Sequence, residues 1–336
     1  MRRLSPARLA GLGVFLLAVV VLALWLLPSD SYIFLPDRAH PVDPLVKIAG
    51  RKTPHDPGGI YFVDVFVRKA TWLERLFPSL REGATVVPAS AVVPPGTSEK
   101  ARVRLDRRAM TRSQEVAAAV ALRAAGYKVR ATPNGVLVDQ VVAGAPAAGK
   151  LQPADVIVKV DGKRVLTPAD LRSAISSRPV GASFRIVVRR DGSLHTVVVR
   201  STTDPQVKGR PVIGVLVGQD ARIELPLSVK INAGDVGGPS AGLAFALDIL
   251  EHLGRDVDHG RRIAATGEIE LDGSVGPIGG VEQKTIGVRK SGIRVFLVPA
   301  GDNAAEARRY ADGVRIVPVK NFQQALRALA TLSKTQ

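Results

Sequence analysis

The chain has no cysteine among its 336 residues, so several kinds of site are excluded at once. It cannot hold a disulfide, a thiolate nucleophile or a cysteine-ligated metal. Aromatic residues make up only 4% of the sequence. The absence of cysteine also permits a location outside the reducing cytoplasm, without demonstrating one.

Acidic residues are scarce relative to basic ones, which gives a formal net charge of +17. The arginines and lysines are scattered, with no run of five, and no zinc-finger, KH or RNP pattern occurs. We therefore expect no nucleic-acid partner, whereas attraction to an anionic membrane surface fits this charge. The length allows two or three domains.

Motifs for metal or nucleotide chemistry are missing as well. No H-E-x-x-H is present, so a zinc protease is not indicated. A Walker A loop needs glycine directly before its lysine, and Gln283 precedes Lys284 in the one similar stretch. The sequence predicts neither a bound metal nor a cofactor.

One long apolar segment, residues 9–27, contains no charged residue. A helix of this length spans about 28 Å, close to the hydrocarbon thickness of a bilayer. Arginines precede it at positions 2, 3 and 8, so residues 1–8 are expected in the cytoplasm. The sequence predicts a single-pass anchor in the cell membrane, with the lipid bilayer as a partner and the remaining chain extracytoplasmic. A cleaved signal peptide is the alternative, but no A-x-A site follows.

Residues 28–57 are rich in proline and aspartate and predict a juxtamembrane linker, with a short strand near 45–48. The segment 58–125 begins with a strong strand pattern after Gly58-Gly59 and ends in an alanine-rich helix from about Thr111. A short amphipathic helix is expected at 72–80 and an extended stretch at 86–95.

Residues 126–203 alternate strand patterns with turn signals and a helix that starts at Thr167-Pro168. The order G-V-L-V, P-A-A-G-x-L and D-V-I-V-x-V-D-G resembles a bacterial PDZ domain, although Ala154 stands where that family usually has glycine. A PDZ domain binds an extended peptide along a sheet edge. The resemblance places its carboxylate-binding loop at Tyr127, Lys128 and Val129.

The stretch G-D-V-G-G-P-S-A-G, residues 234–242, delivers Ser240 to the start of an apolar helical pattern. Free backbone N–H groups at a helix N-terminus favour a developing negative charge, which suits an acyl-transfer nucleophile. A serine in this position can equally be a helix N-cap, so the stretch alone leaves both interpretations open.

A nucleophilic serine needs a base. The five histidines give poor support to a catalytic triad, and His252 lies three helical turns beyond Ser240. Lys284 is the other candidate, because a buried lysine can lose its proton near neutral pH. Most lysines are solvated, and spacing alone does not bring Lys284 to Ser240.

Three motifs resemble the proteolytic domain of Lon proteases: G-P-S-A-G at 238–242, T-G-E-I at 266–269 and G-x-V-x-P-I-G-G-V-x-x-K at 273–284. The resemblance implies Ser240 as nucleophile and Lys284 as base, with Thr266 holding the lysine. It places Gly238, Pro239 and Ala241 around the oxyanion. The chain as a whole resembles the membrane-anchored, PDZ-containing Lon-like serine proteases of bacteria.

The sequence departs from Lon in two ways. Gly237 stands three residues before the serine, where Lon usually has aspartate, and Asp235 precedes it by two; this puts the geometry and latency of the loop in question. No AAA module is recognisable, so the resemblance implies ATP-independent cleavage of unfolded or flexible polypeptides. A hexamer is expected only by analogy with Lon-like rings.

The fold class is therefore predicted to be α+β, with a Lon-like domain formed by residues 58–125 and 206–333 and a PDZ domain inserted between them. The predicted function is that of a serine endopeptidase whose PDZ domain binds peptide tails of substrates or regulators. The alternatives are a catalytically inactive scaffold and a chaperone-like binder at the membrane.

Overall fold

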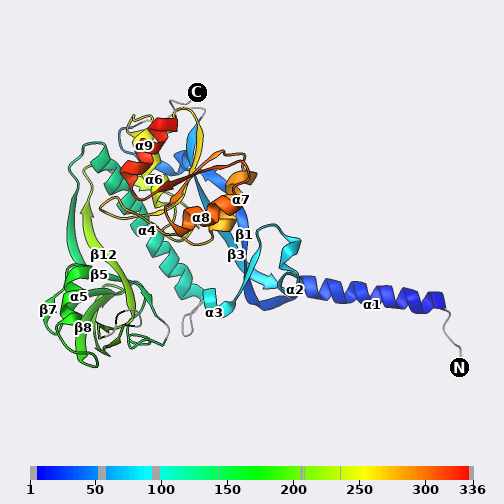
Figure 1. Ribbon diagram of the computed structural model, residues 1–336, viewed down its shortest axis with the longest axis horizontal. Helices are drawn as coiled ribbons and strands as arrows, with labels where there is room; N and C mark the ends of the chain where they lie inside the picture. Colours follow the sequence, from blue (N-terminus) through cyan, green and yellow to red (C-terminus); the bar gives the residue numbers. More distant parts are fainter. Residues whose placement is uncertain are drawn as a thin grey trace. The chain divides into compact units, whose positions relative to one another are not determined.

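The computed structural model describes residues 6–51, 58–92, 99–142, 144–204, 207, 209–234 and 236–332. The chain forms two compact units (Figure 1). Unit 1 combines Met1–Ala125 with Leu227–Gln336, and unit 2 comprises Gly126–Pro226. His55, Asp235 and the end of the expected extended stretch at 86–95 lie outside the described residues.

Unit 1 is built on a six-stranded mixed sheet of order β18-β17-β14-β3-β1-β4. The strands are β1 (Pro28–Pro41), β3 (Gly59–Thr71), β4 (Thr85–Pro88), β14 (Arg262–Ala265), β17 (Val295–Pro299) and β18 (Arg315–Val319). Strand β3 runs antiparallel to β1 and parallel to β14. The segments before and after unit 2 therefore share one sheet.

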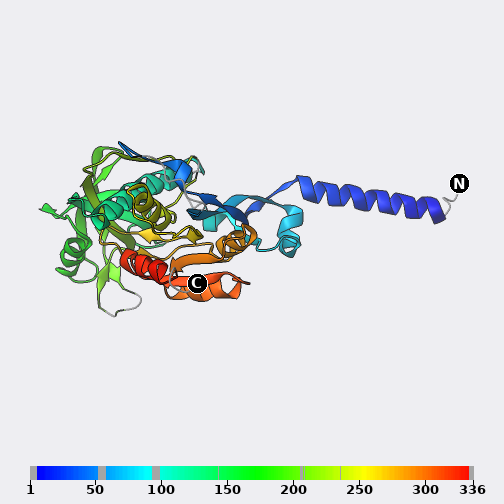
Figure 2. The ribbon, with the colours of Figure 1, turned by 90° about the horizontal axis from the view of Figure 1, so that it is seen from above.

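Helices cover both faces of this sheet (Figure 2). Successive side chains of a strand point to opposite faces. Phe62 of β3 accordingly contacts Phe245 of helix α6, whereas Val63 belongs to the core under α7 and α8. The helices of unit 1 are α1 (Pro6–Leu26), α2 (Trp72–Leu76), α3 (Ala89–Val92), α4 (Glu99–Ala124), α6 (Gly242–His252), α7 (Val281–Lys290), α8 (Asp302–Arg309) and α9 (Phe322–Leu332).

Short elements connect the sheet to the loops around it. The 3-10 helices are η1 (Asp43–Leu45) and η2 (Pro78–Leu80). Strand β2 (Val46–Ile48) pairs with β13 (Val229–Ile231), and β15 (Glu268–Ile269) pairs with β16 (Val275–Gly276). Strand β13 leads directly into the loop that carries Ser240.

Unit 2 is a sheet of order β12-β5-β6-β8-β9 that encloses its own apolar core. Helix α5 (Pro168–Ser176) starts with a capping box between Thr167 and Asp170, as the Thr-Pro signal predicts. Ala154 adopts a φ of +69°, which explains why glycine is usual there. The strands are β5 (Arg130–Val141), β6 (Val156–Val160), β7 (Lys163–Arg164), β8 (Ser183–Arg190), β9 (Ser193–Arg200), β10 (Thr202–Thr203), β11 (Pro211–Val212) and β12 (Val215–Glu224).

Three sequence expectations need correction. Residues 28–41 are no linker but strand β1, because they pair with β3 on one side and β4 on the other and bury Ile33 in an apolar cluster. The Lon-like segment does not resume at 206, since β12 pairs along its length with β5 of unit 2. The alanine-rich helix begins at Glu99 rather than near Thr111.

The expected transmembrane anchor falls on α1. Within the described part of the chain, no helix is both long enough and apolar enough to cross a membrane. The prediction of a transmembrane helix at residues 9–27 is therefore not supported.

Candidate active site

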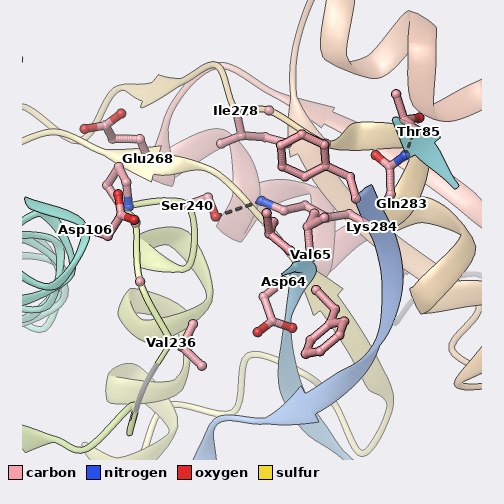
Figure 3. Close-up of a pocket in the computed structure, with 18 of the residues that line it drawn as sticks. Asp64, Val65, Thr85, Asp106, Val236, Ser240, Glu268, Ile278, Gln283 and Lys284 are labelled. Carbon is pink, nitrogen blue, oxygen red and sulfur yellow. Dashed lines mark hydrogen bonds between the residues drawn. The ribbon is translucent and has the colours of Figure 1, made fainter. Parts of the chain in front are cut away.

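Ser240 lies at the end of the loop from β13, two residues before α6 begins at Gly242. Gly238 has a φ of +84°, a conformation that turns the loop and that side-chain-bearing residues rarely adopt. The loop is fixed from α4: Gly238 N donates to the Asp106 carbonyl (3.0 Å) and Ser113 Oγ donates to the Pro239 carbonyl (2.9 Å). These contacts hold the serine at the rim of a cleft (Figure 3).

Lys284 approaches Ser240 from the other side of the cleft. It projects from the first turn of α7, and its Nζ lies 2.7 Å from Ser240 Oγ. Helix α7 packs tightly on β1, where a Cβ at Gly287 would come within 2.0 Å of the Asp37 carbonyl oxygen. Two residues 44 positions apart in the sequence are thus brought into hydrogen-bond contact (Figure 3).

The environment of Lys284 favours its neutral form. Its side chain is buried, with a residue exposure of only 4%. Burial lowers the pKa of Lys284 from 10.5 to about 8, and the nearby Asp64 carboxylate partly opposes this shift. About a tenth of Lys284 at pH 7, and most of it above pH 8, is therefore an amine that can accept a proton.

Thr266 connects both residues. Its Oγ1 donates to the Ser240 carbonyl (3.0 Å) and lies 3.4 Å from Lys284 Nζ. Because one hydroxyl has a single proton, the bond to the carbonyl leaves its lone pairs for Lys284 N–H. Gly267 N also donates to the Ser240 carbonyl (2.8 Å). Thr266 thus turns the free lone pair of a neutral Lys284 toward Ser240.

The residues expected around the oxyanion differ in whether their backbone N–H group is available. Gly238 N is engaged by Asp106, and Pro239 has no N–H. Ala241 is the N-cap residue of α6, and its N–H and that of Ser240 have no partner among the described residues. Of the expected set, only Ala241 therefore offers a free donor beside the serine.

Two acidic residues of the cleft carried no sequence signal. Asp64 on β3 has a raised pKa, first because it is buried and second because Asp37 lies near. Asp106 on α4 packs beside Gly237, where an added Cβ would come within 2.8 Å of Asp106 Cβ. The Asp106 side chain therefore occupies the space that a side chain at position 237 would need, which explains the glycine there.

One edge of β3 is open toward Ser240. Its pairing with β14 ends at Tyr61, and no described strand continues on that side. The four successive residues Asp64–Val67 all line the cleft, as expected when a strand presents its backbone edge rather than one face. This edge offers backbone donors and acceptors to an extended peptide.

The expected carboxylate-loop residues of unit 2, Tyr127, Lys128 and Val129, lie just before β5. The sheet edge, however, belongs to β12, with α5 beside it. Gly214, directly before β12, has a φ of +79°, and the N–H groups of Ile213 and Gly214 have no partner among the described residues. Ile213 and Gly214 therefore offer backbone donors at the start of this edge strand, and the assignment of the loop to 127–129 stays a prediction.

Comparison with known proteins identifies both units. Residues 221–331 match the Lon protease (S16) C-terminal proteolytic domain, and residues 106–200 match the PDZ domain. The chain therefore contains a Lon protease proteolytic domain and a PDZ domain.

Similar proteins include Lon protease 2 of Bacillus subtilis (36% identity over 107 residues, 32% of this chain and 18% of that protein). Lon protease of Mesomycoplasma hyopneumoniae is 40% identical over 91 residues, 26% of this chain and 10% of that protein. The chain thus spans less than a fifth of the length of these two relatives. A PDZ domain of an SdrC-like protein from Listeria monocytogenes is 27% identical, covering 25% of this chain and 87% of that structure, with a TM-score of 0.24.

Proposed function

We propose that this protein is a serine endopeptidase that uses Ser240 as nucleophile and Lys284 as general base. The observation that carries the proposal is the 2.7 Å contact between Ser240 Oγ and a buried Lys284 Nζ. The matches to the Lon protease proteolytic domain support a serine peptidase. An inactive scaffold would have no need to keep a lysine buried against a serine.

The reaction would begin when neutral Lys284 accepts the Ser240 Oγ proton as the oxygen attacks a peptide carbonyl. The resulting oxyanion would lie against the N–H groups of Ser240 and Ala241, at the positive end of α6. Lys284, now protonated, would return the proton to the leaving amine. Water would then hydrolyse the acyl-enzyme with Lys284 again as the base.

The open edge of β3 suggests how a peptide would be held. An extended segment added next to Asp64–Val67 would pair with the strand backbone and present its carbonyl to Ser240. Only an unfolded or flexible segment can adopt this conformation, which favours such substrates. The contact between Ser240 and Lys284 and the proton transfers it supports involve no phosphoryl group, so we propose that cleavage of an already flexible peptide requires no ATP.

The PDZ domain would bind an extended peptide along β12, with a C-terminal carboxylate at the free N–H groups of Ile213 and Gly214. Leu216, on β12, is 56% exposed and available for such a contact. Leu194, on β9 at the opposite edge of the sheet, is also exposed, at 68%, and provides a matched control. Leu216→Lys should weaken binding of a fluorescent C-terminal peptide at least about tenfold, and Leu194→Lys should not.

The test of the proposed activity is cleavage of an unstructured fluorogenic peptide without ATP. Ser240→Ala and Lys284→Met should each reduce turnover by about 10³-fold or more. The matched controls are Ser193→Ala, an exposed residue at the start of β9 in unit 2, and Lys290→Ala, a half-exposed lysine of the same helix as Lys284. Undiminished cleavage by a folded Ser240→Ala or Lys284→Met variant would refute the dyad.

A further inference from the structure

The C-terminal end of α6, remote from Ser240, carries a buried cluster of two aspartates and a histidine. Asp248 and His252 lie one turn apart on this helix, and each side chain is only 2% exposed. Asp43, the first residue of η1, faces them from another segment and is 36% exposed. One candidate ligand atom from each of the three lies within 4.8 Å of the other two.

The contacts of His252 fix the direction of its imidazole. Nδ1 lies 3.1 Å from the Asp248 carbonyl oxygen and 3.1 Å from Asp248 Oδ2. A carbonyl can only accept, so Nδ1 carries a proton and, in the neutral ring, Nε2 carries the lone pair. This Nε2 faces Asp43 Oδ1 at 3.5 Å. Both atoms are buried without a hydrogen-bond partner in the described part of the chain.

With a neutral ring, the lone pairs of Nε2 and Asp43 Oδ1 face each other in a buried place, which is unfavourable unless a proton or a cation lies between them. The surroundings add negative charge. Asp258 is buried nearby and adds its carboxylate to those of Asp43 and Asp248. Even a fully protonated His252 would leave Asp43 and Asp248 with one uncompensated charge between them.

The spacing fits a small divalent cation. Zinc binds histidine nitrogen and carboxylate oxygen at about 2.0–2.2 Å, so two ligand atoms of a tetrahedral site lie about 3.4 Å apart. The 3.5 Å between His252 Nε2 and Asp43 Oδ1 matches this separation. Metal-bound histidines usually donate their other ring N–H to a carbonyl or carboxylate, as His252 Nδ1 does to Asp248.

We propose that His252 Nε2 and Asp43 bind a divalent transition-metal ion of the zinc type, with Asp248 orienting the imidazole from the Nδ1 side. The partial exposure of Asp43 gives the ion access and leaves a position for water. An imidazole nitrogen with a carboxylate oxygen and water is a donor set suited to Zn²⁺ and Co²⁺ rather than to Ca²⁺.

The site joins two segments of unit 1. Asp43 opens η1, whose Leu45 carbonyl accepts from Asn232 N (3.0 Å), and β2 pairs with β13 just before the Ser240 loop. His252 and Asp248 belong to α6, which begins just after that loop. A bound ion therefore ties the segment entering the loop to the helix leaving it, and stabilises the folded state by mass action.

The probe is Co²⁺, added to the full-length protein after treatment with EDTA and removal of the chelator. The chain has no cysteine and five histidines, so visible absorption reports imidazole and carboxylate ligation only. We expect saturation at one Co²⁺ per chain, displacement by Zn²⁺ and a higher unfolding temperature with either ion. Asp43→Asn should weaken binding at least about tenfold, and His252→Gln should abolish it.

The controls replace histidines that also lie beside acids. His40→Gln removes the histidine next to Asp37 and Asp64, and His259→Gln removes the one next to Asp256. Both should bind Co²⁺ like the wild type. The proposal is wrong if the wild type shows no saturable binding, if a folded Asp43→Asn variant binds unchanged, or if His40→Gln abolishes the signal.

Discussion

The burial of Lys284 predicts the pH dependence of peptide cleavage. If the neutral amine is the base, kcat/KM of the free enzyme should follow the neutral fraction of Lys284. With a pKa of about 8, that fraction is about 9% at pH 7 and about 91% at pH 9. The rate should therefore rise about tenfold between pH 7 and pH 9 and then level off. A solvated lysine with its ordinary pKa of 10.5 would show no plateau below pH 10.

The charge of Asp64 provides a second test of the pH profile of kcat/KM. Its carboxylate raises the pKa of Lys284 against the larger effect of burial. Asp64→Asn removes that charge, so the midpoint of the profile should move to lower pH. Lys290→Ala, which changes an exposed charge on the same helix, should leave the midpoint unchanged.

The assay is kcat/KM from pH 6 to 10 on an unstructured peptide without titratable groups in that range. Burial raises the pKa of Glu251 to about 7, so protein stability can change in the same pH range. Circular dichroism at each pH distinguishes unfolding from a change in catalysis. A flat profile, or a midpoint near 10.5, would refute the assignment of Lys284 as a buried base. A midpoint that moves upward in Asp64→Asn would refute the electrostatic reasoning.

Three further outcomes follow from the same contacts. The pKa of Lys284 is lower in the folded state than in the unfolded state, so the buried charge destabilises the fold fully below pH 8 and progressively less as the pH rises to 10.5. Lys284→Met should therefore increase the free energy of unfolding at pH 7 by about 2 kcal/mol, measured by urea titration. A decrease would contradict this cost of burying the charge. Thr266→Val should lower kcat about 10–100-fold, and Thr266→Ser should restore it, because only the hydroxyl orients Lys284. Gly287→Ala should cost about 3 kcal/mol or prevent folding, since its Cβ meets the Asp37 carbonyl at 2.0 Å, while Gly279→Ala has open space and should be neutral in thermal unfolding.

The site residues were accessible from the sequence because they lie in short motifs. Ser240, Thr266 and Lys284 could be named from their local patterns and the resemblance to Lon. Periodicity could not place Lys284 against Ser240, because the contact depends on how α7 packs on β1. Asp64 and Asp106 were missed for a similar reason: each lies in a segment whose sequence shows only a strand or a helix.

The fold was less predictable where long-range pairing decides the structure. Residues 28–41 contain three prolines and three charged residues, so no alternating pattern stands out. They form a strand because β3 and β4 lie on either side of them. The turn signals in unit 2 are local, which is why the helix at Thr167 and the Asp-Gly turns could be predicted while the pairing of β12 with β5 could not.

Covalent labelling tests the central claim most directly. A fluorophosphonate reacts with an activated serine, and mass spectrometry of peptides from the full-length protein locates the adduct. We predict one adduct, on Ser240, which forms at least about 10²-fold more slowly in Lys284→Met and at the wild-type rate in Lys290→Ala. Labelling of another residue, or of Ser240 at an unchanged rate in Lys284→Met, would contradict activation of Ser240 by Lys284.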